Sequence, residues 1–191
     1  LTGQVSGYTL VNYIDLFTDA RVGKSYLFTF KFAILATIIT NIIALILALG
    51  LNSKIKAKST LRGIYFVPRI LGGLVVGYIF GYIFTYILPA VTGTSSMLSS
   101  TNTAWIAIVI VASWQAIAQT TLIYISGLQT VPEDVYEAGA IDGATGWKSF
   151  KSLTLPLIIP FLSINMVLSM KDFLMVFDQI MSLTKGGPAQ S

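Results

Sequence analysis

The fold is decided first by the run Phe32-Ala-Ile-Leu-Ala-Thr-Ile-Ile-Thr-Asn-Ile-Ile-Ala-Leu-Ile-Leu-Ala-Leu-Gly-Leu51, which holds no charged residue. A helix needs about 20 mostly apolar residues to cross the hydrocarbon core of a bilayer. The run meets that length and predicts a membrane-spanning helix that starts near residue 26. Because backbone polar groups in lipid must be paired within their own segment, a helix is the expected form of such a run.

Three more stretches of this kind follow, so we expect spans at about 26–51, 64–88, 104–128 and 156–183. The chain is 54% hydrophobic and 10% charged, whereas a soluble domain carries about 25% charge. A soluble bundle is disfavoured because no polar helix face of ordinary size remains to meet water. The expected fold class is all-α, a polytopic transmembrane helical bundle in which residues 1–191 form one membrane domain.

The composition also excludes several kinds of chemistry. The chain has no Cys and no His, which excludes disulfides, cysteine nucleophiles, Cys/His zinc sites and histidine acid–base catalysis. It begins at Leu1 without a signal-peptide pattern, and we expect it to be part of a longer protein.

The positive charges predict the topology. Six of the twelve Lys and Arg residues lie in two connecting segments, 52–63 and 129–155. The positive-inside rule places these two segments in the cytoplasm and both chain ends outside. The six residues are Lys54, Lys56, Lys58, Arg62, Lys148 and Lys151. Their place beside helix ends explains the net charge of +4 without a nucleic-acid partner.

The cytoplasmic segment 129–155 has a regular pattern of its own. Pro132 suits the first turn of a helix with Thr130 or a neighbour as its cap, which predicts a short helix over about 132–140. Asp142-Gly143 is a turn signal, and a second helical piece is expected from near Thr145 into the last span. A helix–turn–helix on the cytoplasmic face is suited to docking into a groove of a partner protein.

This segment resembles the EAA motif of permease subunits of ABC importers, in the form seen in the sugar-transporting branch. The matching residues are Glu137-Ala138-Gly139, Gly143, Leu153 and Leu155-Pro156, with the Asp142-Gly143-Ala144 triplet and Phe150 also similar to the sugar branch. Residues 8–17 and 183–188 resemble the segments that flank the spans in the same permeases. One departure is Gly139, where the family usually has Ala, and Gly in a helix costs about 0.5–1 kcal/mol relative to Ala.

The resemblance implies the type I ABC importer permease fold, alternating access and a multi-pass place in a bacterial or archaeal cell membrane. It implies a second permease subunit of distinct sequence, two ATPase subunits and an extracytoplasmic sugar-binding protein as partners. Such permeases usually have six spans, so this chain would lack the first and the last. The residues implied to couple the chain to the ATPase are Glu137, Ala138, Gly139, Asp142, Gly143 and Ala144. The chain is expected to bind no cofactor and to be no enzyme itself, since hydrolysis belongs to separate chains.

Charged residues inside the last expected span point to a substrate path. At 100° per residue, the polar side chains of this span and Met175 fall within one arc of roughly 140°. Intramembrane charges cost roughly 2.5–3.5 kcal/mol each and persist where they face a wet cavity or a partner charge. The arc either lines a hydrophilic path or forms a structural ion pair between helices. Its members are Asn165, Lys171, Asp172, Met175, Asp178 and Gln179.

Other patterns are left open or set aside. Gly73, Gly77 and Gly81 permit close approach of another helix, either as static packing or as a sliding surface. Gln115 and Gln119 either line a pore or bond across helices, and Arg69 is expected to reach the membrane interface without a further role. The sequence around 143–149 lacks the Gly that a phosphate loop needs before its Lys, and the acidic residues of 133–142 are expected to be a solvated helix face, with no metal. The alternatives in function are a non-sugar ABC permease, an ion-driven secondary transporter and a membrane-embedded enzyme.

Overall fold

The structure is a computed structural model, and it describes residues 19–52, 63 and 67–185. All regular elements within these residues are helices. The α-helices are α2 (Ala20–Asn52), α4 (Gly73–Tyr82), α5 (Leu88–Thr92), α6 (Thr101–Gln129), α7 (Glu133–Ile141), α8 (Gly146–Ser149), α9 (Leu155–Leu174) and α10 (Asp178–Thr184). Two π-helical turns, Ile83–Ile87 and Phe150–Thr154, join α4 to α5 and α8 to α9, and Met97–Ser99 is a 3₁₀ turn. The basic residues of 54–62 and the family landmarks at 8–17 and 186–188 lie outside the described residues.

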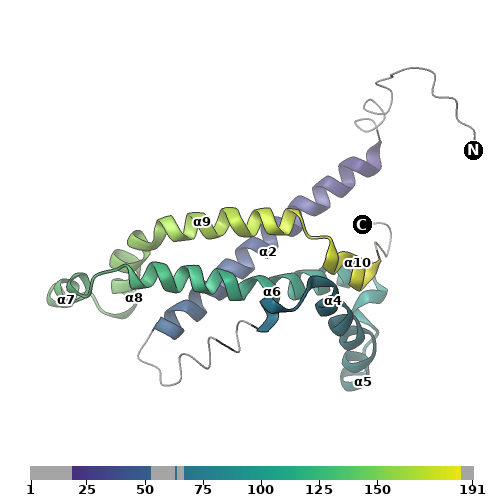
Figure 1. Ribbon diagram of the computed structural model, residues 1–191, viewed down its shortest axis with the longest axis horizontal. Coiled ribbons are helices and arrows are strands. Elements are labelled where there is room, and N and C mark those ends of the chain that lie inside the picture. Colours follow the sequence, from purple (N-terminus) through teal and green to yellow (C-terminus); the bar gives the residue numbers. More distant parts are fainter. Residues whose placement is uncertain (1–18, 53–62, 64–66, 186–191) are drawn as a thin grey trace, which may run out of the picture.

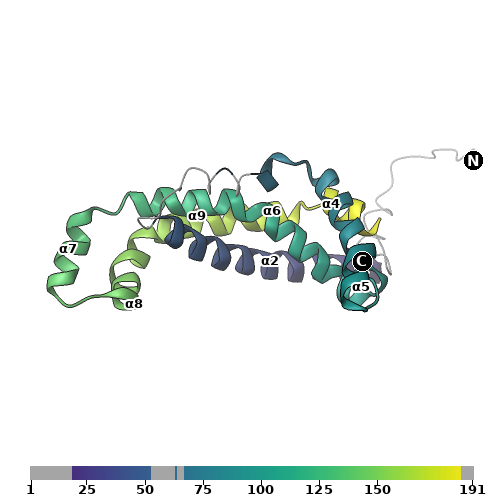
Figure 2. The same ribbon diagram turned by 90° about the horizontal axis from the view of Figure 1, so that it is seen from below.

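Three long helices form the body of the molecule. Figure 1 shows α6 and α9 side by side along its length, with α2 crossing them. The short helices α7 and α8 project at one end, whereas α4, α5 and α10 gather at the other (Figures 1 and 2). The last turn of α2 lies at the α7–α8 end, since Leu49 and Asn52 border the same groove as Tyr136 and Trp147. This arrangement places the described edges of 52–63 and 129–155 on one side, in agreement with the topology predicted from charge.

Small side chains let α2 and α6 approach closely. Ala33, Ala36, Thr40, Ala44 and Ala48 of α2 are fully buried and recur every three or four residues, which is the spacing of one helix face. The opposite face of α2 exposes large apolar side chains such as those of Ile34, Ile38, Ile42 and Ile46. Such a distribution suits a helix in lipid, where small residues form the helix contacts.

Buried polar side chains tie the three long helices together. The Tyr124 hydroxyl of α6 donates to Asn41 Oδ1 of α2 at 2.8 Å, and Asn41 Nδ2 donates to Ser169 Oγ of α9 at 3.3 Å. Asn165 Nδ2 of α9 donates to the Thr120 carbonyl of α6 at 3.1 Å. Interhelical hydrogen bonds in membranes contribute about 0.6–1.7 kcal/mol each, so this network stabilises one arrangement of the three helices.

The helices long and apolar enough to span a membrane are Val22–Asn52, Gly73–Thr92, Thr103–Gln129 and Gly146–Leu174. Two of them differ from the predicted ranges. For the span predicted at 64–88, the described chain leaves the helical conformation at 71–72, so the spanning helix begins at Gly73. The predicted helix over 156–183 is wrong, because α9 ends at Leu174 and the chain turns through 175–177 before α10 begins.

The glycine stripe of α4 explains where α10 packs. A Cβ atom at Gly73 would lie 2.9 Å from Asp178 Cβ, and one at Gly77 would overlap the Ser182 side chain. Both neighbours belong to α10, so the missing side chains allow the two helices to touch. The stripe is therefore a packing contact in this structure, which is one of the two interpretations left open above.

Candidate transport path and coupling surface

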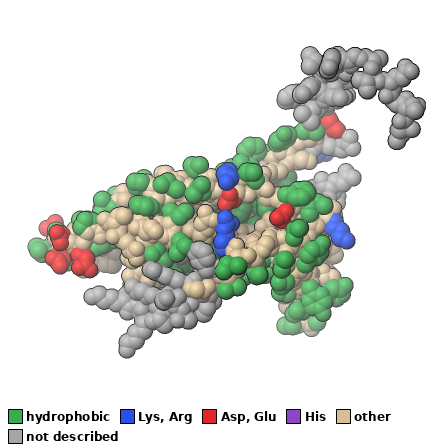
Figure 3. All heavy atoms as spheres, viewed as in Figure 1, with side chains coloured by type: hydrophobic (Ala, Val, Ile, Leu, Met, Phe, Trp, Pro, Cys, Tyr) green, Lys and Arg blue, Asp and Glu red, His purple; other side chains and the backbone are tan. Residues whose placement is uncertain are grey.

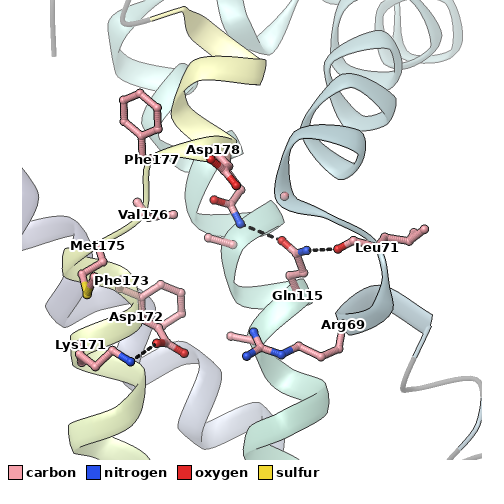
Figure 4. Close-up of a pocket in the computed structure, with 14 residues that line it drawn as sticks. Arg69, Leu71, Gln115, Lys171, Asp172, Phe173, Met175, Val176, Phe177 and Asp178 are labelled. Carbon is pink, nitrogen blue, oxygen red and sulfur yellow. Dashed lines mark hydrogen bonds and ion pairs between the residues drawn. The ribbon is translucent and has the colours of Figure 1, made fainter.

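A cavity of about 460 Å³ opens between α6, the end of α9, the start of α10 and the segment before α4. Figure 4 shows its side chains. The charged and amide side chains that line it are Arg69, Gln115, Lys171, Asp172, Asp178 and Gln179. Two of these charges are positive and two are negative, so the described wall is balanced in charge. In Figure 3, a row of basic and acidic side chains lies about halfway along the molecule, and an acidic group lies at the α7 end.

Both helix breaks border this cavity. Leu71 belongs to the break before α4 and Gly73 is the first residue of α4, whereas 175–177 form the break between α9 and α10. Gln115 Nε2 donates to the Leu71 carbonyl at 2.7 Å, and its Oε1 accepts from Gln179 Nε2 at 2.8 Å. The Gln115 side chain, on the unbroken helix α6, thus forms hydrogen bonds to polar groups at both breaks. Non-helical backbone is tolerated at membrane depth only where its polar groups are bonded in this way or border a water-filled cavity.

The charged pair of α9 lines the cavity. Lys171 Nζ lies 3.3 Å from Asp172 Oδ1, and the two side chains are 62% and 39% exposed. Neither side chain is deeply buried, so the pair contributes little to stability. Its opposed donors and acceptors instead face the open space of the cavity, where they are able to bind a polar solute.

The structure brings together five of the six predicted path residues. Lys171, Asp172, Met175, Asp178 and Gln179 all line the cavity. The single helical arc is wrong, however, because Asp178 and Gln179 reach the cavity through the turn at 175–177 and not through continued helical periodicity.

Asn165 stands apart from the other five. Its side chain is 1% exposed and is bonded to the Thr120 carbonyl between helices, away from the larger cavity. Arg69 was expected to reach the membrane interface without a further role, but its side chain lines the cavity. The sequence signal was the intramembrane charge itself, together with Gly72-Gly73 as a helix breaker three residues later.

The opposite end of the molecule carries the predicted coupling residues on a compact hairpin of α7 and α8. Pro132 stands at the helix N-cap, and the Thr130 hydroxyl donates to the Gly127 carbonyl at 2.7 Å, so Thr130 does not cap α7 as expected. Gly143 has φ +74°, a conformation that favours glycine, and its amide donates to the Ala140 carbonyl at 3.1 Å. The Ala144 amide donates to the Gly139 carbonyl at 2.8 Å, which closes the turn.

The predicted coupling residues divide between the inside and the outside of this hairpin. Glu137, Ala138, Asp142 and Gly143 are exposed, whereas Gly139 is buried and a Cβ there would overlap Leu153. Ala144 is half-buried. The hairpin also exposes two large apolar side chains that sequence reasoning missed, since Ile141 is 87% exposed and Trp147 is 73% exposed. Large apolar and aromatic side chains that are exposed on a surface are candidate anchors for a protein partner.

Known proteins share both the sequence pattern and the fold. Residues 40–186 match the family described as "Binding-protein-dependent transport system inner membrane component". The chain is 35% identical over 188 residues to the "Probable starch degradation products transport system permease protein AmyD" of Thermoanaerobacterium thermosulfurigenes, covering 95% of this chain and 64% of the relative. It is 38% identical over 187 residues to the "Multiple sugar-binding transport system permease protein MsmF" of Streptococcus mutans, covering 94% and 64%. It is 36% identical to the "Trehalose/maltose transport system permease protein MalF" of Thermococcus litoralis, covering 94% and 63%.

The chain therefore spans a little under two thirds of the length of these relatives. Its fold is similar to that of a chain in a bacterial ABC transporter involved in the import of the acidic polysaccharide alginate, with a TM-score of 0.83 and 18% identity over 98% of this chain and 68% of the other. These findings confirm the predicted fold class, the membrane location and the resemblance on which the functional expectation depends. The chain belongs to the family of binding-protein-dependent transport system inner membrane components.

Proposed function

We propose that this chain is part of a permease subunit of an ATP-driven sugar importer. The observation that carries the proposal is the cavity of about 460 Å³, which holds charged and amide side chains within the helical bundle. Sugar hydroxyls both donate and accept hydrogen bonds, so they suit a wall on which guanidinium, ammonium, carboxylate and amide groups alternate. The names of three relatives, which refer to starch degradation products, multiple sugars and trehalose/maltose, support a sugar as the cargo.

The hairpin and the family description support the following partners for this chain. A second permease subunit of distinct sequence would complete the path, and an extracytoplasmic binding protein would deliver the sugar, as the family description implies. Two ATPase subunits would bind ATP, and the α7–α8 hairpin would dock into a groove of one of them. This chain would bind no cofactor and hydrolyse no ATP, and its function would be to carry motion from the hairpin to the cavity.

The proposed cycle is alternating access. ATP-driven closure of the ATPase pair would move the hairpin, and the helices continuous with it would shift so that the cavity opens outward. Hydrolysis would return the cavity to the inward-facing state. Broken helices around a polar site near the middle of the membrane are a recurring feature of transporters, because exposed backbone groups there are tolerated only beside a cavity.

The experiment is uptake in a strain that lacks the full-length gene. Growth and uptake of labelled maltose, maltotriose and trehalose are measured with the gene restored, and again after deletion of the neighbouring ATPase genes. Uptake that depends on both supports the proposal. Uptake that survives loss of the ATPase would indicate an ion-driven transporter, and uptake of glycerol 3-phosphate without any sugar would indicate a non-sugar importer.

The cavity is tested with Asp172→Leu and Asp178→Leu, which remove its two carboxylates. Lys31→Leu is the control, since Lys31 is an exposed charge on α2 that does not line the cavity. We expect both aspartate variants to reduce uptake at normal levels of assembled complex and the control to leave it intact. Normal uptake in both aspartate variants would show that this cavity is not the path.

A further inference from the structure

Behind the large cavity lies a second, much smaller one of about 10 Å³, which is the space of about one water molecule. The two cavities share the side chains of Arg69, Ala116 and Asp172. Beyond this shared wall, the smaller cavity is lined mainly by polar side chains of α6 and α9, which are Gln119, Thr120, Asn165 and Ser169. These three shared residues form the wall between the larger cavity and the smaller polar cavity.

The residue numbers that line the two cavities show which cavity lies closer to the α7–α8 hairpin. Residue numbers in α6 rise toward the α7–α8 hairpin, and those in α9 rise away from it. The smaller cavity has higher numbers on α6 and lower numbers on α9 than the larger one, so it lies on the hairpin side. Ala116 is about 20 Å from either end of α6 at 1.5 Å per residue, which places the shared wall near the middle of the membrane.

Two opposite charges face each other at this wall. Figure 4 shows Arg69 and Asp172 on opposite sides of the cavity, with the guanidinium and the carboxylate pointing toward one another. They come from different elements, since Arg69 precedes α4 and Asp172 is in the last turn of α9. A guanidinium offers five N–H donors and a carboxylate offers two acceptor oxygens, so together they match the donor and acceptor sides of neighbouring sugar hydroxyls.

Lys171 provides a contrast within the same turn of α9. It pairs with Asp172 at 3.3 Å, but its side chain lines only the larger cavity and is 62% exposed. Lys171 is therefore not a member of the shared wall. A substitution of Lys171 therefore removes a nearby positive charge without removing a member of the wall.

We propose that Arg69 and Asp172 form a charged neck of the transport path, which binds the hydroxyls of a passing sugar and separates the outer cavity from the cytoplasmic side. The sugar part of this inference rests on the proposed function. The barrier part rests only on the geometry, since these two side chains border both the cavity of about 460 Å³ and the cavity of about 10 Å³.

The barrier is tested by single-cysteine labelling in the assembled transporter. These 191 residues contain no cysteine, and any cysteine elsewhere in the full-length chain is replaced by serine. Val176→Cys reports the larger cavity and Gln119→Cys the smaller one. Right-side-out vesicles are treated with a charged, membrane-impermeant methanethiosulfonate, and the labelling of each cysteine is followed over time.

We expect Val176→Cys to react at least about tenfold faster than Gln119→Cys, because a charged reagent must cross the neck to reach the latter. Arg69→Ala combined with Asp172→Ala should bring the two rates close together, whereas Lys171→Ala should leave the difference intact. Should the double substitution prevent assembly, the milder pair Arg69→Gln and Asp172→Asn replaces it. Equal rates in the unaltered neck, or a Gln119→Cys rate that no neck substitution changes, would overturn the barrier.

Binding by the neck is tested by uptake kinetics with labelled maltotriose. Arg69→Gln and Asp172→Asn should each weaken uptake by about tenfold in kcat/KM, the loss expected for one charge-assisted hydrogen bond. Lys31→Gln, which changes an exposed charge of α2 that lines neither cavity, should change it by less than about twofold. Exchange of the two charges, Arg69→Asp with Asp172→Arg, should recover part of the uptake that each reversal removes alone. If the parent protein takes up sugar and the neck variants do so equally well, the inference fails and the proposed function stands. If the parent takes up none of the sugars, the proposed function fails and the labelling result still decides the barrier.

Discussion

Gln115→Leu removes the side chain that joins the two helix breaks. In the structure this residue is buried, donates to the Leu71 carbonyl at 2.7 Å and accepts from Gln179 at 2.8 Å. Leu has a similar volume and is well suited to a membrane helix, so the substitution removes the hydrogen bonds and not the packing. The effect therefore reports what these two bonds contribute.

The magnitude follows from the number of bonds and their surroundings. Each interhelical hydrogen bond in a membrane contributes about 0.6–1.7 kcal/mol, so two give about 1–3 kcal/mol. The cavity admits water, which replaces part of the loss at the freed Leu71 carbonyl and Gln179 amide. We therefore expect a loss of about 1–2 kcal/mol in the free energy of unfolding.

The assay is unfolding of the purified transporter by titration with dodecyl sulfate, followed by fluorescence and circular dichroism. Gln119→Leu is the matched control, because Gln119 lies one turn further along α6 and the described residues offer its side chain no hydrogen bond. A double-mutant cycle with Gln179→Leu should give a coupling of about 0.6–1.7 kcal/mol between Gln115 and Gln179. Additive effects, or equal losses from Gln115→Leu and Gln119→Leu, would refute the bridge between the breaks.

Three further outcomes concern glycines. Gly77→Val should place a side chain into Ser182 and destabilise the α4–α10 contact by about 1–3 kcal/mol, seen as a lower unfolding midpoint, whereas Gly81→Ala, whose Cβ would lie 3.9 Å from Leu183, should be neutral. Gly143→Val forces a β-branched residue into φ +74° at a cost of about 1–2 kcal/mol, so less ATPase should co-purify with the complex while the spans stay folded. Gly139→Ala should loosen the hairpin because its Cβ meets Leu153, and adding Leu153→Ala should restore slow hydrogen exchange in α7; equal exchange in the single and double variants would contradict this contact.

The long apolar runs predicted the helices because their length alone matches the membrane. The hairpin was also accessible from sequence, since Pro132, the acidic first turn and Asp142-Gly143 are local signals that act within a few residues. Gly72-Gly73 is a sequence signal for the break at 71–72, but it lies within a long apolar stretch that by its length predicts a single span. The break at 175–177 has no Gly or Pro, and it forms where Gln179 bonds to a residue 64 positions away.

The same distinction separates the predicted residues that line the larger cavity from Asn165. A polar residue in a membrane helix needs a partner, and periodicity shows only which face it occupies. Water in a cavity and a carbonyl of the next helix both meet that need. Asp172 has the first kind of surroundings and Asn165 the second, and only tertiary packing decides between them.

The connection between the two ends of the molecule runs through α9. This helix starts directly after the π-helical turn Phe150–Thr154 at the hairpin and ends at the break beside the cavity, a length of about 30 Å for its 20 residues. Asp172 is part of α9, whereas Arg69 belongs to a segment that lies beside α6 and is not continuous with the hairpin. A shift of the hairpin along or across the bundle therefore displaces one wall of the neck relative to the other. Because the two side chains face each other across the cavity (Figure 4), such a displacement changes the distance between them. Under the proposed function, this is the physical means by which a docked ATPase would control the passage of a sugar.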